Sequence, residues 1–184
     1  MYLNTMAFTF GCTNLSCVPP NVTAFMDTQE QWTKATAAAK KASDPFWRSV
    51  DMLMQQYDGL AAGYATCMPS KPLPAFALQV LNGVGDLFQI IPSVVKERRQ
   101  AWHKMSRTQV RAALQKQGHC SALIRVPGAL EDLLMAHSSW FEYPNMDRIF
   151  KYYSLDGRTT AFSSYPGYLE SLDDFYMISS GLVS

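Results

Sequence analysis

Gly118-His119-Cys120-Ser121-Ala122-Leu123-Ile124-Arg125 is the stretch at which the chain changes from a helical to a strand-like pattern. Ala122, Ile124 and Val126 alternate with Ser121, Leu123 and Arg125, and the turn-forming pair Pro127-Gly128 and the apolar run Leu133-Leu134-Met135-Ala136 follow. Two such runs separated by a turn are typical of a β-hairpin. If these strands pair, Cys120 at the start of one and His137 at the end of the other lie at the same end of the sheet.

The chemistry of Cys120 indicates a nucleophile of a particular kind. A thiol with an ordinary pKa of about 8.5 is mostly protonated at neutral pH and needs a base before it attacks. If the bond between His119 and Cys120 were cut, Cys120 would gain an α-amino group with a pKa near 8, which can act as that base. The same sulfur can make the cut by attacking the preceding carbonyl. From composition alone, a cysteine in an apolar strand is more often a packing residue.

The region upstream of Gly118 is predicted to be helical. Residues 23–42 are rich in alanine and long polar residues, and Ser43-Asp44-Pro45 is a typical start for a second helix. Residues 68–74 contain three prolines and are predicted to form a loop, and an apolar segment over 76–91 follows. The second helix is predicted to bury one face, which carries Trp47, Val50, Leu53, Tyr57 and Leu60.

Downstream of the hairpin a short helix, a turn and two more strands are predicted. The helix is indicated by the spacing of Met146, Ile149, Phe150 and Tyr153. Asp156-Gly157 predicts the turn, and residues 159–164 and 175–183 the strands, with Pro166-Gly167 between them. Asp173 and Asp174 are adjacent, so on a strand they point to opposite faces and cannot act as a paired acid and base.

Composition limits the class of protein. The chain has 184 residues, of which 48% are hydrophobic and 12% aromatic, with a net charge of +1. It is therefore predicted to fold around a core, and its charge gives no reason to expect a nucleic-acid partner. No apolar run approaches the ~18 residues of a membrane span. No cofactor is expected, and a metal site built from His103, His119, His137 and Cys120 lacks ligand spacing.

One tract of the chain is strongly basic. It contains a single acidic residue, Glu97, against Lys96, Arg98, Arg99, Lys104, Arg107, Arg111 and Lys116. The favoured interpretation is an exposed linker upstream of the cleavage point, because cleavage needs an accessible tract. Trp102, Val110 and Leu114 also form an apolar stripe, so peripheral contact with an anionic membrane is the alternative.

The first twenty-odd residues contain features that matter if the chain enters the secretory route. Two acceptor sequons for N-glycosylation begin at Asn14 and Asn21. If the chain enters that route, a disulfide between Cys12 and Cys17 is expected. Cys67 is then left over, and is predicted to be a buried apolar residue or the partner of a cysteine outside the chain.

Several uncommon strings over residues 118–184 resemble the phospholipase B-like proteins. Besides the stretch at Cys120, they are 132–140 (Asp-Leu-Leu-Met-Ala-His-Ser-Ser-Trp), 147–153, 162–167 and 173–183. The resemblance is weaker upstream of residue 118. It implies an α+β fold of the N-terminal nucleophile hydrolase type, an αββα sandwich, matured by cleavage just before the cysteine that Cys120 matches.

The resemblance also implies the site and the organisation of the chain. Cys120 would be the nucleophile, the bond between His119 and Cys120 the cleavage site, and His137 and Trp140 part of the substrate pocket. Residues 1–117 would form a mainly helical prosegment with a basic linker at 96–117. Residues 118–184 would form the first part of the partial sandwich, truncated at the C-terminus, so that the remainder of the parent chain is a partner.

The function implied is hydrolysis of acyl ester or amide bonds in lipid catabolism, with lipid and amide or peptide substrates both open. This chain alone is expected to be inactive. The alternative is a catalytically inactive or truncated protein of the same fold that binds lipid or a partner. The family implies a glycoprotein that is lysosomal or secreted, although Met1-Tyr2-Leu3-Asn4-Thr5-Met6 has no basic start typical of a signal peptide.

Overall fold

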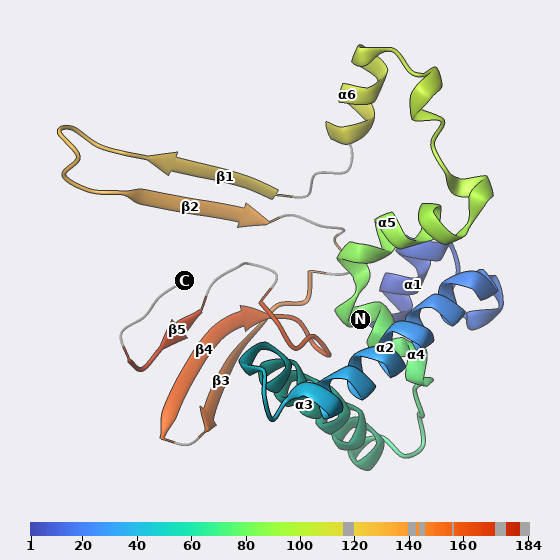
Figure 1. Cartoon of the computed structure of the whole chain (residues 1–184), viewed down its shortest axis with the longest axis horizontal. Coiled ribbons are helices and arrows are strands. Elements are labelled where there is room, and N and C mark those ends of the chain that lie inside the picture. The colour runs from blue at the N-terminus through green and yellow to red at the C-terminus, as the bar shows by residue number, and fades with distance from the viewer. Residues whose placement is uncertain (116–119, 140–142, 144–145, 156, 172–175, 181–184) are drawn as a thin grey trace. The chain divides into compact units, whose positions relative to one another are not determined.

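A computed structural model describes residues 1–115, 120–139, 143, 146–155, 157–171 and 176–180 of the chain (Figure 1). These residues form two compact units, which we describe separately. The first consists of Met1–Arg99 together with Gly167–Leu169, and the second of Gln100–Pro166 with Glu170–Ser184. His119, Trp140, Asp173 and Asp174 lie outside the described residues.

The first unit is helical where it has regular structure. Its elements are α1 (Tyr2–Phe10), η1 (Leu15–Cys17), α2 (Pro20–Lys40), α3 (Pro45–Cys67), α4 (Ala75–Asn82), α5 (Val84–Val94) and η2 (Lys96–Arg98). The predicted helix over 23–42 and the predicted loop over 68–74 are confirmed. The predicted apolar segment over 76–91 forms two helices that meet at Gly83. A side chain at Gly83 would approach the carbonyl oxygen of Gln79 to 2.9 Å, which favours glycine there.

The core of the first unit joins α1, α2, α4 and α5. Its buried residues are Met6, Val18, Val22, Phe76, Val80 and Leu87. Aromatic contacts extend it from α1, where Phe8 lies 5.8 Å from Phe88 and Phe10 lies 6.4 Å from Phe76 between ring centroids. Apolar residues at helical spacing thus converge from four helices on one centre, as expected for amphipathic helices.

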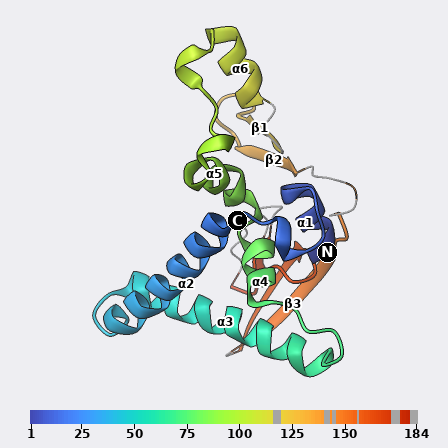
Figure 2. The ribbon, with the colours of Figure 1, turned by 90° about the vertical axis from the view of Figure 1, so that its right-hand side faces the viewer.

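The long helices α2 and α3 form a helical hairpin (Figure 2). Asp44 caps α3, since its side chain accepts a hydrogen bond of 2.9 Å from the backbone N–H of Phe46. The predicted stripe on α3 is confirmed in position for Trp47, Val50, Tyr57 and Leu60, which are half-buried, but no α3 residue is fully buried. The prediction for Leu53 is wrong, since it is 50% exposed, and Met54, four residues after Val50, lies on the half-buried face instead.

A short strap, Gly167–Leu169, belongs to the first unit although it is distant in sequence. Asn82 at the end of α4 holds it, because its side-chain amide donates to the carbonyl oxygen of Gly167 (3.1 Å) and accepts from the backbone N–H of Leu169 (2.8 Å). Gly167 has φ +86°, which favours glycine, and a side chain there would approach Leu81 to 2.8 Å. Pro166-Gly167, expected between two strands, forms a turn.

The described residues of the second unit form two short helices and two small antiparallel sheets. Its elements are η3 (Trp102–Lys104), α6 (Arg107–Gln115), β1 (Cys120–Arg125), β2 (Leu134–Ser139), β3 (Ile149–Leu155), β4 (Arg158–Ser164) and β5 (Met177–Ile178). Strands β1 and β2 form one sheet, and the order β3-β4-β5 forms the other. The predicted strand–turn–strand at Cys120 is confirmed.

The predicted short helix carrying Ile149, Phe150 and Tyr153 is wrong, because these residues lie in strand β3. Residues 149–155 pair along their whole length with β4, with Lys151 opposite Phe162. Aromatic and β-branched side chains favour such pairing, and the rings of Tyr153 and Phe162 lie 5.4 Å apart. The predicted strand over 159–164 is confirmed as β4, whereas the described part of 175–183 has only Met177–Ile178 as a strand.

The fold class is therefore mixed helix and sheet, as expected for an α+β protein. The division between the two compact units lies at Arg99. The predicted boundary between residues 117 and 118 is a different one, because it marks the end of the proposed prosegment, and it stays a prediction. Cys67, at the end of α3, is exposed, so the prediction that it is buried is wrong.

Candidate functional site

The register of the β1–β2 hairpin brings Cys120 and His137 to one face of one sheet end. Cys120 lies opposite Ser139, and Ala122 lies opposite His137. Because side chains alternate along a strand and opposite residues share a face, Cys120 and His137 are diagonal neighbours. Diagonal neighbours across a strand pair are typically about 7–8 Å apart.

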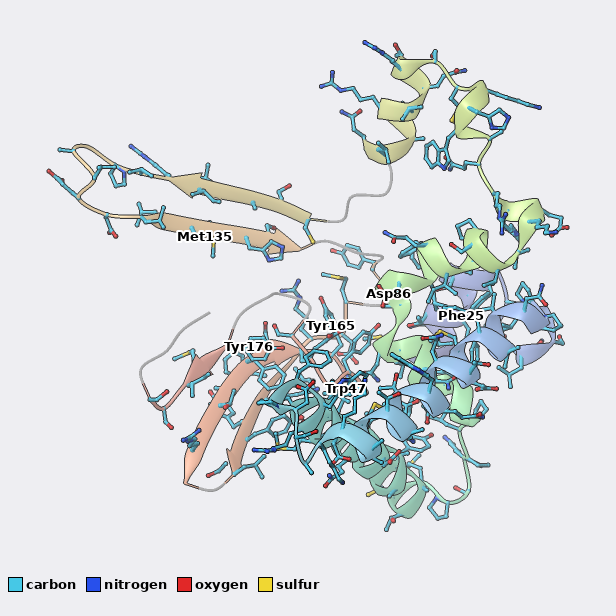
Figure 3. The ribbon with its side chains drawn as sticks, viewed as in Figure 1. Phe25, Trp47, Asp86, Met135, Tyr165 and Tyr176 are labelled. Atoms are coloured by element: carbon cyan, nitrogen blue, oxygen red, sulfur yellow. A yellow bond between two sulfur atoms is a disulfide. The ribbon has the colours of Figure 1, made fainter. Side chains whose placement is uncertain are left out.

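Two apolar residues, Ile124 and Met135, continue the same face. They lie opposite each other in the register, and Met135, labelled in Figure 3, is 76% exposed. The sequence pattern alone does not assign these two residues to the site. Every second residue along β1 from Cys120 shares its face, and the same rule identifies the residues of β2 once the pairing of the strands is known.

The opposite face of the hairpin carries exposed apolar side chains too, beside Ser121, Arg125 and Ser138. Leu123, 64% exposed, is flanked there by Leu134 of the paired strand, which is exposed too. A strand with apolar side chains on both faces is typical of a sheet that is covered on both sides. Cys120 is also exposed, and the predicted site residues His119 and Trp140 lie outside the described part of the chain.

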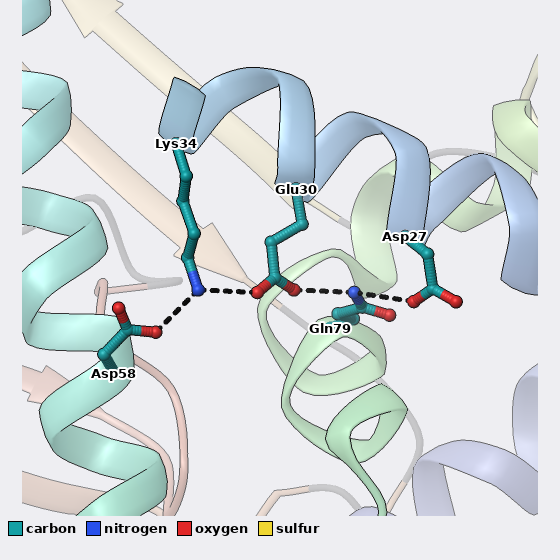
Figure 4. A network of polar contacts seen from close by, with 5 residues as sticks. All are labelled: Asp27, Glu30, Lys34, Asp58 and Gln79. Carbon is teal, nitrogen blue, oxygen red and sulfur yellow. Dashed lines mark hydrogen bonds and ion pairs between the residues drawn. The ribbon is translucent and has the colours of Figure 1, made fainter. Parts of the chain in front are cut away.

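A separate cluster of charged and polar side chains ties α2, α3 and α4 together in the first unit (Figure 4). Lys34 contacts Glu30 at 2.8 Å and Asp58 at 2.7 Å through its ammonium nitrogen. The side-chain nitrogen of Gln79, a residue that is 7% exposed, donates to Glu30 at 2.7 Å and to Asp27 at 3.2 Å. Each carboxylate is thereby matched with a donor.

The pKa shifts in this cluster follow from its contacts. Burial raises the pKa of Tyr57 above its ordinary value, and the neighbouring carboxylates, Glu30 first, add to the effect. Burial alone would lower the pKa of Lys34, but the hydrogen bonds to Asp58 and Glu30 outweigh it and raise that pKa. These groups keep their neutral-pH states more firmly, which suits a structural tie between helices rather than proton transfer.

Two absences concern only the residues that the structure describes. Among them, no group of three or more His, Cys, Asp or Glu side chains is arranged to hold a metal ion. None of the helices formed by the described residues has the length and apolar character needed to cross a bilayer.

The two predicted glycosylation residues differ in their surroundings. Cys12 and Cys17 are joined by a disulfide with their Cα atoms 6.4 Å apart. Asn14 lies in the loop between them, exposed, with its side-chain oxygen accepting a hydrogen bond of 2.9 Å from the backbone N–H of Ser16. Asn21 lies in the first turn of α2, and its amide nitrogen, the atom that would carry a glycan, donates to the carbonyl oxygen of Val94 at 3.3 Å.

Comparison with known proteins places the chain in a family. The family model described as phospholipase B matches residues 1–184. The chain is 44% identical to phospholipase B-like 1 of Bos taurus and 42% identical to that of Homo sapiens, in each case over 86% of this chain, and 38% identical to phospholipase B of Crotalus adamanteus over 90% of it. It spans about 30% of the length of these relatives. No solved structure matches it. The chain belongs to the phospholipase B family.

Proposed function

We propose that the protein is a hydrolase that cleaves acyl ester or amide bonds through Cys120, and that its substrates are lipids. The observation that carries this proposal is the register of the hairpin, which begins β1 at Cys120 and puts His137 on the same face of the sheet. The names of the relatives, phospholipase B and phospholipase B-like 1, favour an acyl lipid as the substrate.

The proposed maturation step is an intramolecular acyl shift at the bond between His119 and Cys120. The Cys120 thiolate attacks the carbonyl carbon of the preceding residue, a C–S bond forms, the C–N bond breaks, and the nitrogen takes a proton to become the α-amino group. Water then attacks the thioester, which releases the thiolate and leaves a carboxyl group on residue 119. The new amino group lies beside the sulfur and acts as its base.

The proposed reaction repeats this chemistry on a substrate. The sulfur attacks the substrate carbonyl and the α-ammonium group gives a proton to the leaving alcohol or amine. Water then attacks the acyl thioester, its proton passes to the α-amine, and the fatty acid leaves. His137 acts from the same face, where its imidazole is positioned to orient the carbonyl or to stabilise developing negative charge. Trp140 is proposed as a pocket wall.

The proposed fold of the parent protein is an αββα sandwich, with residues 1–117 as a prosegment. The apolar side chains on both faces of β1–β2 support it, because each sheet of such a sandwich is covered on one face by the other sheet and on the other by helices. The disulfide between Cys12 and Cys17 supports an oxidising route of export, and so a secreted or lysosomal glycoprotein.

The test starts from the native protein. Intact masses and the N-terminal residue of each fragment are expected to show a species that begins at Cys120. Cys120→Ala should stay uncut, and Cys120→Ser should be cut and should hydrolyse acyl substrates far more slowly. His137→Gln should lower kcat at least about tenfold while cleavage persists. An uncut native chain that does not hydrolyse acyl substrates would favour a non-catalytic protein that binds lipid or a partner. Full hydrolysis by Cys120→Ala would refute the assignment of Cys120 as the nucleophile.

A further inference from the structure

The segment 102–115 combines features that the proposed hydrolysis does not use. It consists of η3, a turn and α6 (Figure 1), and it contains Lys104, Arg107 and Arg111 with no acidic residue. We infer that this segment, the α6 anchor, binds the surface of an anionic lipid bilayer.

Local sequence determines where α6 begins. Ser106 and Gln109 form a reciprocal capping box, in which the Gln109 side chain accepts from the backbone N–H of Ser106 (2.8 Å) and the Ser106 hydroxyl accepts from that of Gln109 (3.3 Å). The helix is nine residues long, shorter than the ~12–15 residues that an isolated helix needs in water. A surface that covers one side of α6 would therefore stabilise the helix.

The side chains of α6 form two adjacent rows. Val110 and Leu114 lie one turn apart, as do Arg107 and Arg111, and the four line an open groove of about 560 Å³ together with Met105 and Gln115. Leu114 is 54% exposed. Within its unit, α6 makes no extensive contact with another described helix or strand. An apolar row bordered by guanidinium groups is thus presented to the outside.

This arrangement fits a bilayer surface in particular. Arginine pairs with lipid phosphates, while the apolar row and the 42% exposed Trp102 can enter the boundary between headgroups and acyl chains. A nucleic acid offers the same phosphates but nothing that buries Val110 and Leu114, and the segment has no motif that reads bases. Exposure of the tract also agrees with its use as a linker upstream of Cys120.

The experiment measures flotation of the full chain with vesicles, in a Cys120→Ala background that keeps the chain in one piece. Vesicles of phosphatidylcholine alone are compared with vesicles that contain about 30% of the anionic lipid phosphatidylserine. We expect binding to the anionic vesicles only, and weaker binding at high salt. Arg107→Glu with Arg111→Glu should lower the partition coefficient at least about thirtyfold, because each basic side chain contributes about fivefold.

Two further variants separate this inference from simpler explanations. Lys71→Glu with Arg158→Glu makes the same change in net charge at exposed positions outside the segment and should leave binding nearly unchanged. Val110→Ser with Leu114→Ser keeps the charge and should lower binding about tenfold. Equal loss in the control pair, no loss in the serine pair, or no preference for anionic vesicles would each overturn the inference.

The inference stands apart from the proposed function. Hydrolysis of a soluble ester by the processed protein, without vesicles, should not change in the Arg107→Glu, Arg111→Glu variant. Failure of vesicle binding therefore leaves the proposal for Cys120 intact, and failure of hydrolysis leaves the membrane anchor to be judged by flotation alone.

Discussion

Replacing Gln79 by glutamate should destabilise the helical unit strongly and in a pH-dependent way. The Gln79 side chain is 7% exposed and donates two hydrogen bonds to carboxylates, at 2.7 Å to Glu30 and at 3.2 Å to Asp27. A hydrogen bond to a charged group contributes about 1.5–3 kcal/mol. The shorter bond lies in this range, and the longer one, to the exposed Asp27, contributes less.

Gln79→Glu removes both donors and brings a third carboxyl group into the cluster. We therefore expect a loss of about 3 kcal/mol in the free energy of unfolding at pH 7. Burial and the two neighbouring carboxylates raise the folded-state pKa of the introduced group above its unfolded value near 4.3. The loss is thus complete above the folded-state pKa and shrinks as the pH falls toward about 4, where the group is protonated in both states.

The assay is urea unfolding followed by far-ultraviolet circular dichroism, for the natural chain and the variant at several pH values between about 4 and 8. This range covers the expected titration of the introduced glutamate. Gln89→Glu is the matched control, since Gln89 is an exposed residue of α5; it should change stability by less than about 0.5 kcal/mol. A loss below about 1 kcal/mol for Gln79→Glu, or one that stays constant with pH, would refute this account of the cluster.

Three further predictions follow from the first unit. The pKa values of Tyr57 and Lys34 are raised, so the folded chain keeps these protons at a pH where the unfolded chain has lost them; their contribution to the free energy of unfolding is present below pH ~10 and is lost as the pH rises further. In urea titrations at alkaline pH, Tyr57→Phe should make the free energy of unfolding fall less steeply with pH, by nearly one proton. An unchanged slope would contradict the assignment. In a secretory host, Asn14→Gln should remove one glycan mass, because Asn14 is exposed in the loop between Cys12 and Cys17; an unchanged intact mass would rule out a glycan at this residue. Changing both Cys12 and Cys17 to serine should lower stability by about 2 kcal/mol, as expected for a loop closed by residues five apart in sequence; equal urea midpoints with and without the disulfide would rule this out.

Local pattern was a good guide where the signal lies within one element. The cap at Asp44 and the loop over 68–74 depend on residues whose own backbone preferences favour one conformation, and both are found as predicted. It failed for Ile149, Phe150 and Tyr153. Their spacing of one and three suits a helix, yet their aromatic and β-branched side chains pair with β4, a partner that spacing within one segment does not reveal.

Burial was predicted less well than secondary structure. Apolar residues on α3 are spaced as on a core helix, but burial depends on which other helices cover that face, and α3 packs mainly on α2. The same holds for Cys67, whose apolar character says nothing of whether a neighbour covers it.

The sequence by itself determined the mixed fold class, the family and the strand–turn–strand at Cys120, because strings of residue types and periods of two and three to four are carried by the chain alone. Only the tertiary structure decided the register that puts Cys120, His137 and Met135 on one face, since a shift by one residue would turn β2 over. It also decided that Gln79, Glu30 and Lys34, from two helices distant in sequence, meet in one polar cluster. Side chains far apart along the chain become neighbours only when helices pack or strands pair, and no local period contains that information.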